Sequence, residues 1–194
     1  MEQNVAKRVP YGIQDFVQVI EQNCYYVDKT AYIPKLEDCP NNLFCIRPRR
    51  FGKSVFLSML HAYYDCRTKD KFQEWFGNLW IGKHPTPLQG RYQVMHLDFS
   101  QVGGSIENLE EKFNFYLGVQ LNGFIRDYLD FYSEKVQKQV EDAKDAGGKL
   151  AIIQSEARSK GYPLYLIIDE YDNFTNTVLN EQGEDVYWAI THAE

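Results

Sequence analysis

Residues 43–54 constrain the fold of this chain more than any other segment, because they join an apolar run to a helical pattern through a basic loop. Residues 43–46 read LFCI, which predicts a buried strand, and residues 47–54 read RPRRFGKS. After the loop, apolar side chains recur at roughly helical spacing as far as Tyr63. The segment therefore predicts a strand, a loop and a helix in that order.

The loop has the pattern G-x-x-x-x-G-K-S/T of a phosphate-binding loop, except that Arg47 stands where the first glycine belongs. Gly52 lets the backbone approach an anion, Lys53 supplies a positive charge, and the Ser54 hydroxyl is suited to ligate Mg²⁺. A helix beginning here adds the positive end of its dipole. The predicted nucleotide-binding residues are Arg49, Arg50, Phe51, Gly52, Lys53 and Ser54. The alternative is a basic surface turn that contains Gly-Lys-Ser by chance.

Residues 165–170 read YLIIDE, an apolar strand that ends in two carboxylates. This is the form of a Walker B strand, which delivers an acid next to the Mg²⁺ of a phosphate-binding loop. We predict that Asp169 binds the metal together with Ser54, and that Glu170 is the catalytic general base that orients the attacking water. A strand ending in Asp-Glu is common by itself, but here it follows the loop in the expected order.

Composition limits the class of protein. The chain has 194 residues, of which 44% are hydrophobic, enough for one domain or a little more with a real core. A net charge of −6 argues against a protein that coats nucleic acid, because such proteins are usually basic. The sequence has no signal-peptide core, no long apolar run and no zinc-like cysteine spacing. We therefore expect a reduced, cytoplasmic protein without a membrane span.

Strands alternate with helices along the chain. Strands are predicted at residues 43–46, 93–100 and 165–170, with a strand-like segment at 25–27. Helices are predicted at residues 15–21, 28–36, 53–64, 71–76, 106–142 (one or two helices), 150–160 and 174–179, with a break at 143–149. This alternation predicts an α/β fold, a P-loop NTPase-like parallel sheet flanked by helices. A complete core of this kind needs more strands, so we expect the fold to be C-terminally incomplete, with later core strands absent.

Six segments together carry a resemblance to a known family. They are PYGIQDF at residues 10–16, YYVDKT at 25–30, RPRRFGKS at 47–54, HPTP at 84–87, LDFS at 97–100 and IDEYDNF at 168–174. With these segments the chain resembles the AAA-ATPase-like domain family, a bacterial P-loop NTPase family common in Bacteroidetes. The loop of that family also lacks the first glycine, so its absence here is a family trait.

The resemblance implies a P-loop fold with ATP and Mg²⁺ as cofactors. It implies one AAA-ATPase-like domain over residues 1–194, in which residues 1–42 are an N-terminal extension. The family domain often precedes a PD-(D/E)XK nuclease-like domain, so such a domain or nucleic acid is an expected partner in the full-length context.

Other segments have both a functional and a structural interpretation. Residues 28–30 either help to form the nucleotide pocket or cap a short helix. Residues 11–16 either wrap the adenine or form a packing loop. Asp98 and Ser100 end a predicted strand at the sheet edge where α/β proteins bind ligands, and there they would assist the metal or the water.

The function predicted from these features is ATP binding, with Mg²⁺-dependent hydrolysis in the complete context. The alternatives are a nucleotide-binding switch or scaffold that does not hydrolyse, and an inactive truncated fragment. Glu170 favours the enzyme, whereas the short C-terminal part favours the alternatives, because the transition state often needs an arginine supplied from elsewhere. Arg49 and Arg50 either contact phosphate, pair with the strand-end carboxylates, or face another subunit.

The segment 113–132 is rich in aromatic rings. It predicts either self-association through an uncovered apolar surface or the core of a monomer. A homo-oligomer of this chain is therefore one of the two expected states, beside a monomer.

Overall fold

The structure is a computed structural model that describes residues 6–40, 42–46, 51–100, 108–170, 179 and 183. The chain divides into two compact units, Met1–Tyr92 and Gln93–Glu194, and each is described by itself. The prediction of one domain over residues 1–194 stays a prediction.

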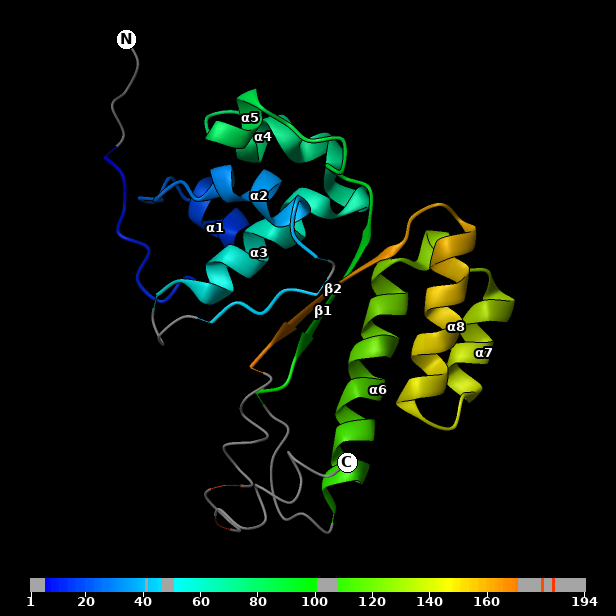
Figure 1. The fold of residues 1–194 in the computed structure, drawn as a ribbon. Helices are drawn as coiled ribbons and strands as arrows, with labels where there is room; N and C mark the ends of the chain where they lie inside the picture. Colours follow the sequence, from blue (N-terminus) through cyan, green and yellow to red (C-terminus); the bar gives the residue numbers. More distant parts are fainter. Residues whose placement is uncertain are drawn as a thin grey trace. The chain divides into compact units, whose positions relative to one another are not determined.

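The N-terminal unit is a group of short helices around α3 (Figure 1). Its helical elements are α1 (Phe16–Glu21), η1 (Thr30–Tyr32), α2 (Ile33–Glu37), α3 (Lys53–Tyr64), η2 (Cys66–Lys71), α4 (Phe72–Phe76) and α5 (Trp80–Lys83). α1 packs against α3 and α4, and α5 packs against α4 and η1. The helix predicted at residues 53–64 is confirmed.

Aromatic rings form the core of this unit. Phe16 stacks on Phe76 with ring centroids 4.9 Å apart, and Tyr63 meets Phe76 edge-on at 5.6 Å. All three side chains are fully buried. Such pairs bury large apolar areas and prefer stacked or edge-to-face geometry, so the core fixes α1 and α4 against α3.

The strand predicted at residues 43–46 is wrong. Residues 42–46 have no regular secondary structure, and the side chains of Phe44 and Ile46 are 80% and 86% exposed. A strand needs a neighbouring strand to satisfy its backbone N–H and C=O groups, and within the described part of the chain none pairs with this segment. Cys45, predicted as a buried hydrophobe, is accordingly half-buried. Residues 25–27 also form no strand.

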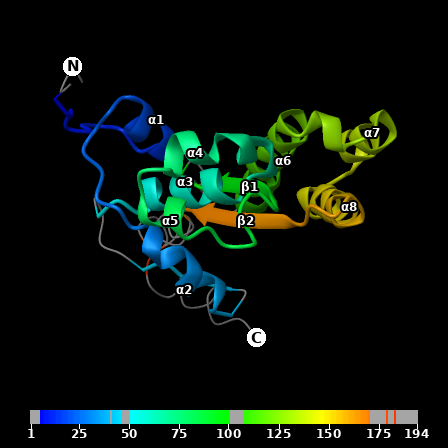
Figure 2. The same ribbon diagram turned by 90° about the horizontal axis from the view of Figure 1, so that it is seen from above.

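The C-terminal unit is α/β, as predicted. In the described residues its sheet has two parallel strands, β1 (Gln93–Asp98) and β2 (Leu164–Asp169), which lie side by side in Figures 1 and 2. Its helical elements are α6 (Leu109–Asp127), η4 (Leu129–Phe131), α7 (Glu134–Asp142) and α8 (Ala146–Ser159). α6 packs on β1, α8 packs on β2, and α6, α7 and α8 contact one another.

Part of the ring-rich segment forms the core of this unit. Tyr128 is buried, and its hydroxyl accepts the backbone N–H of Val94 at 2.7 Å. The buried Tyr132 donates its hydroxyl to Oε1 of Gln93 at 2.6 Å. These bonds join the end of α6 and the residues after η4 to β1. Phe115 is 65% exposed, so the segment is not wholly core, and self-association stays a prediction.

The stretch at 106–142, predicted as one or two helices, is two helices, α6 and α7, separated by η4. One helix boundary differs from the prediction. The break predicted at 143–149 is shorter than expected, because α8 already begins at Ala146. Asp145 caps α8, and its side chain accepts the backbone N–H of Gly148 at 2.7 Å. The cap compensates for two glycines in the first turn, which favour the helix least among ordinary residues.

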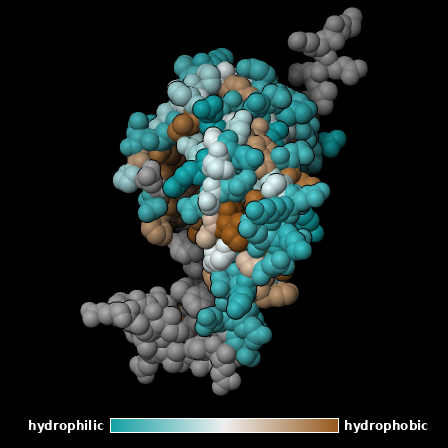
Figure 3. Space-filling view, turned by 90° about the vertical axis from the view of Figure 1, so that its right-hand side faces the viewer, coloured by the Kyte–Doolittle hydropathy of each residue, from teal (hydrophilic) through white to brown (hydrophobic). Residues whose placement is uncertain are grey.

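Figure 3 shows the side of the molecule on which α7 and α8 lie in Figure 1. The coloured surface on this side is mostly hydrophilic, with several smaller hydrophobic areas. In α7, Val140 is the buried residue, and most of the other side chains are charged or amide groups. None of the helices in the described residues combines the length and the hydropathy that a membrane span requires.

Candidate functional site

α3 begins at the end of the predicted phosphate-binding loop, directly after Gly52. Gly52 is the N-cap residue and is left-handed, with φ 75° and ψ 31°. Its carbonyl accepts the N–H of Phe56 at 3.1 Å, the first bond of the helix. A residue with a Cβ is strained in this conformation, which explains why glycine stands before Lys53.

The N-cap residue of α3 is glycine, which has no side chain to accept the first-turn N–H groups. These N–H groups and the dipole of the 12-residue helix point toward the loop. Lys53 and Ser54 are the first two helical residues, and both are half-buried. A helix start with these properties fits an anion such as a phosphate group.

Of the remaining residues of the predicted loop, the structure describes only Phe51. Phe51 is 64% exposed. Arg47, Arg49 and Arg50 lie outside the described residues, so the roles predicted for Arg49 and Arg50 stay predictions.

Residues 28–30 tie η1 to α5, which supports their structural interpretation. Oδ1 of Asp28 accepts the N–H and the hydroxyl of Thr30 at 2.8 and 2.7 Å, and Oδ2 accepts the N–H of Trp80 at 2.7 Å. The buried Thr30 hydroxyl oxygen in turn accepts the N–H of Ile81 at 3.1 Å. Asp28 and Thr30 thus supply acceptors for the start of both elements.

The segment 11–16 divides into two parts. Asp15 caps α1 by accepting the N–H of Gln18, and its other oxygen accepts the hydroxyl of Ser58 on α3 at 2.7 Å. Ser58 also accepts the N–H of Phe16 at 3.0 Å. These contacts support the packing interpretation for the end of the segment. Tyr11 is 96% exposed, so packing does not explain it, and its predicted contact with adenine stays a prediction.

The predicted acidic residues end the strands of the C-terminal unit. In the parallel register Asp98 of β1 is the partner of Asp169 of β2. Asp169 is 7% exposed, and its Oδ1 accepts the N–H of Glu170 at 2.9 Å. The structure therefore brings Asp98, Asp169 and Glu170 together at the carboxyl edge of the sheet, where α/β proteins bind ligands.

Glu170 has a backbone conformation that the sequence did not reveal. Its φ is 54°, which is uncommon for a residue with a side chain. Such conformations cost on the order of 1–3 kcal/mol and cluster at functional sites. The strain marks the turn at Glu170, directly after the buried Asp169, as a site candidate.

Gln120 is a neighbour of this edge that sequence analysis missed. Its side-chain oxygen accepts the N–H of Asp98 at 2.7 Å, and its side-chain nitrogen donates to the carbonyl of Asp98 at 3.0 Å. The side chain of Asp98 accepts the N–H of Ser100 at 2.8 Å. α6 therefore fixes the end of β1, and no motif around Gln120 signals this role.

The predicted metal ligands lie in different units, Ser54 in the first and Asp169 in the second, and their pairing stays a prediction. Among the described residues no group of three or more His, Cys, Asp or Glu side chains is arranged to hold a metal ion. Mg²⁺ bound to nucleotide requires no such group, since it takes one or two protein oxygens and phosphate oxygens. A serine hydroxyl and an aspartate carboxylate are each oxygen donors of the kind that Mg²⁺ takes.

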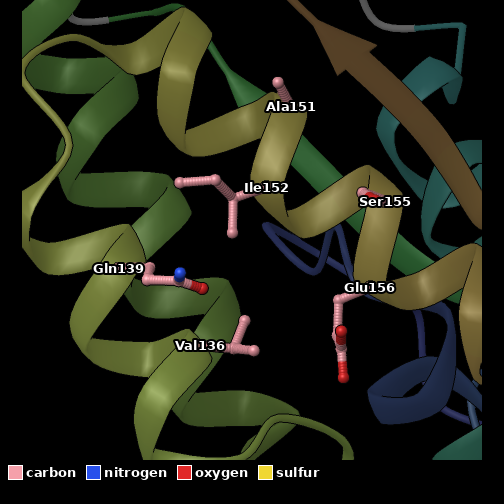
Figure 4. Close-up of a pocket in the computed structure, with 6 residues that line it drawn as sticks. All are labelled: Val136, Gln139, Ala151, Ile152, Ser155 and Glu156. Carbon is pink, nitrogen blue, oxygen red and sulfur yellow. The ribbon is translucent and has the colours of Figure 1, made fainter.

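A groove between α7 and α8 is a separate feature of the C-terminal unit (Figure 4). It is lined by Val136, Gln139, Ala151, Ile152, Ser155 and Glu156. None of these is a predicted site residue, so the groove does not belong to the candidate site.

The chain belongs to the AAA-ATPase-like family, described as "Predicted AAA-ATPase", whose match covers residues 10–193. It is also similar to the "Uncharacterized protein in vnfD 5'region" of Azotobacter chroococcum mcd 1, with 27% identity over 172 residues. The match covers 86% of this chain and 29% of that relative, so the chain spans less than a third of the relative's length. No solved structure matches the chain.

Proposed function

We propose that this chain is an ATP-binding P-loop domain that supports Mg²⁺-dependent ATP hydrolysis in its complete context. The observation that carries the proposal is the start of α3, where left-handed Gly52 precedes Lys53 and Ser54. Membership of a family of predicted AAA-ATPases supports ATP as the anion. The proposed fold is that of a P-loop NTPase. The proposed location of the protein is the cytoplasm.

The start of α3 binds and orients the phosphates. Backbone N–H groups of the first turn donate to phosphate oxygens, and the Lys53 ammonium offsets the charge of the β- and γ-phosphates. Ser54 and Asp169 would hold Mg²⁺, which when bound neutralises charge on the transferred phosphoryl group. Arg49 and Arg50 add positive charge to the loop.

Glu170 acts on the attacking water. Its carboxylate accepts a proton from the water oxygen and orients that oxygen toward the terminal phosphorus. Neighbouring backbone bonds hold Glu170 in place: its N–H donates to Asp169, and the carbonyl of Asp169 accepts the N–H of Phe99 at 3.1 Å. The strained turn therefore sets the direction of the Glu170 side chain.

The proposed context of the domain is a larger protein. The match to under a third of a longer relative is consistent with this. In that context a nuclease-like domain, nucleic acid or a second copy of the chain is the proposed partner. If the chain binds nucleotide without turnover, the function is a nucleotide-dependent switch or scaffold.

Ligand-induced stabilisation tests the proposal. A ligand at 100 times its Kd stabilises the native state by about 2.7 kcal/mol, so millimolar MgATP should raise the Tm of the wild-type chain. Lys53→Ala should remove the shift, and the control Lys71→Ala, on an exposed lysine that pairs with Glu74, should keep it. The absence of any shift in the wild-type chain would contradict ATP binding. A phosphate-release assay on the same samples separates the ATPase from the switch.

A further inference from the structure

A second lysine reaches the start of α3 from a different element. Lys29 is the residue before η1, and a Cβ built at Gly52 would lie 3.4 Å from its ammonium nitrogen. The Lys29 ammonium thus lies beside the left-handed glycine at which α3 begins. Lys53 follows the same glycine along the chain, so lysines from two segments are placed at one helix start.

The backbone around Lys29 is held firmly. Both oxygens of Asp28 are engaged, with Thr30 on one side and the N–H of Trp80 on the other, and the Lys29 carbonyl accepts the N–H of Tyr32 at 3.1 Å. In the part of the chain that the structure describes, the half-buried Lys29 ammonium has no hydrogen-bond or ion-pair partner. The neighbouring carboxylate of Asp28 is committed to backbone N–H groups instead.

This arrangement favours an anion. The start of α3 carries a partial positive charge, and the Lys29 ammonium beside Gly52 adds a full charge from another element. A ligand with several negative charges is attracted to this positive potential, and its oxygens are acceptors for the Lys29 ammonium.

We propose that Lys29 is a phosphate-binding residue, whose ammonium donates to an oxygen of the polyphosphate held at the start of α3. The inference rests on the proposed function and adds to it a residue from outside the loop motif. It also assigns separate roles within residues 28–30. Asp28 and Thr30 position the segment, and Lys29 contacts the ligand.

Calorimetric titration of the whole chain with MgATP, and separately with inorganic triphosphate, tests the proposal. Lys29→Gln should weaken both ligands by about 10-fold to 100-fold, the loss expected for one charge-assisted hydrogen bond. Lys35→Gln is the matched control, because Lys35 lies on the adjoining α2 with its ammonium 5.3 Å from the ring centroid of Tyr32. The control should bind as the wild type does, and Lys29→Arg should recover part of the affinity. Circular dichroism verifies that each variant is folded.

The outcomes separate the two proposals. If MgATP binding requires Lys53 but is unchanged in Lys29→Gln, the role of Lys29 is overturned and the proposed function stands. If triphosphate binding depends on Lys29 but MgATP binds no tighter than triphosphate, the ATP site is overturned and the role of Lys29 stands. If the wild type binds neither ligand, both proposals fail.

Discussion

The two groups of predicted site residues, one in each unit, are built in different ways. At the start of α3, the predicted residues Gly52, Lys53 and Ser54 are consecutive, and one left-handed glycine fixes their geometry. At the sheet edge, Asp98 and Asp169 come from strands far apart in sequence and meet through the parallel register. A short motif can therefore specify the first group, whereas the second group depends on the fold of its unit.

The carboxylates of the two units also differ in the contacts they make and in the backbone beside them. In the N-terminal unit Asp28 and Asp65 accept backbone N–H groups at the starts of elements, and Asp65 also pairs with Arg67 at 2.9 Å. In the C-terminal unit Asp98 and Asp169 also accept backbone N–H groups, but there Asp169 precedes Glu170, a residue with strained backbone. We infer that the N-terminal carboxylates described here stabilise structure, and that those at the sheet edge serve chemistry.

The largest effect is expected from Glu170→Gln. If the sheet edge serves chemistry, this variant should lose about 100-fold to 10,000-fold of the phosphate-release rate, because an amide cannot take the proton. Binding of MgATP should stay within a few fold of wild type, since the start of α3 is unchanged. Single-turnover phosphate release measures the rate, and equal rates in both proteins would exclude Glu170 as the base.

Core truncations sharpen the comparison between the units. Phe76→Ala removes a fully buried ring in the N-terminal unit and should cost about 3–5 kcal/mol, and Leu121→Ala in α6 should cost about 2–5 kcal/mol. Urea unfolding measures these losses, and hydrogen exchange should show faster exchange chiefly in the unit that carries the change.

Phe44→Ala, at an 80% exposed ring, is the control and should change stability by less than about 0.5 kcal/mol. A large loss there would contradict the placement of residues 42–46.

Asp65 provides the pH test of a structural carboxylate. Burial raises the pKa of Asp65, but hydrogen bonds from His61 and Arg67 outweigh burial and hold it below its ordinary value of 3.8. Because the pKa of Asp65 is lower in the folded chain than in the unfolded chain, its contribution to stability is complete above the pKa of the unfolded chain. The contribution is lost as the pH falls through the pKa of the folded chain. Asp65→Asn should cost about 2 kcal/mol at neutral pH and weaken the acid dependence of unfolding below about pH 4. An unchanged acid dependence would show that Asp65 does not titrate as the contacts require.

The smallest effects should have opposite signs at two glycines. Gly52→Ala should cost about 1 kcal/mol, because φ is 75° there. Gly118→Ala in the middle of α6 should stabilise by up to about 1 kcal/mol, because a Cβ at that position meets nothing within 4 Å. Thermal unfolding compares the two. Equal effects at both sites would argue against a left-handed residue at the start of α3.

Sequence analysis predicted the features that depend on local patterns. The helix at residues 53–64 followed from the spacing of apolar residues, the strand that ends at Asp169 from an apolar run, and the α/β class from the alternation of strands with helices. The strand at residues 43–46 failed because its apolar pattern does not supply a pairing partner. The helix start at Ala146 was missed because the cap from Asp145 outweighs the low helix propensity of two glycines.

The candidate site was predictable to a similar degree. The identities of Gly52, Lys53 and Ser54 follow from a motif, and the left-handed glycine agrees with it. The positive φ of Glu170 and the bonds from Gln120 depend on tertiary contacts that leave no periodic signal. The position of Lys29 beside Gly52 likewise required the structure.

Hydrogen exchange with and without MgATP tests the central claim most directly, because it locates the ligand. We expect MgATP to slow amide exchange in peptides that cover residues 51–56 of the wild-type chain, and to leave exchange there unchanged in Lys53→Ala. Peptides from α7 and α8 serve as the internal reference, since the groove between these helices is not part of the site. Protection confined to α7 and α8, or no protection at the start of α3, would contradict the account.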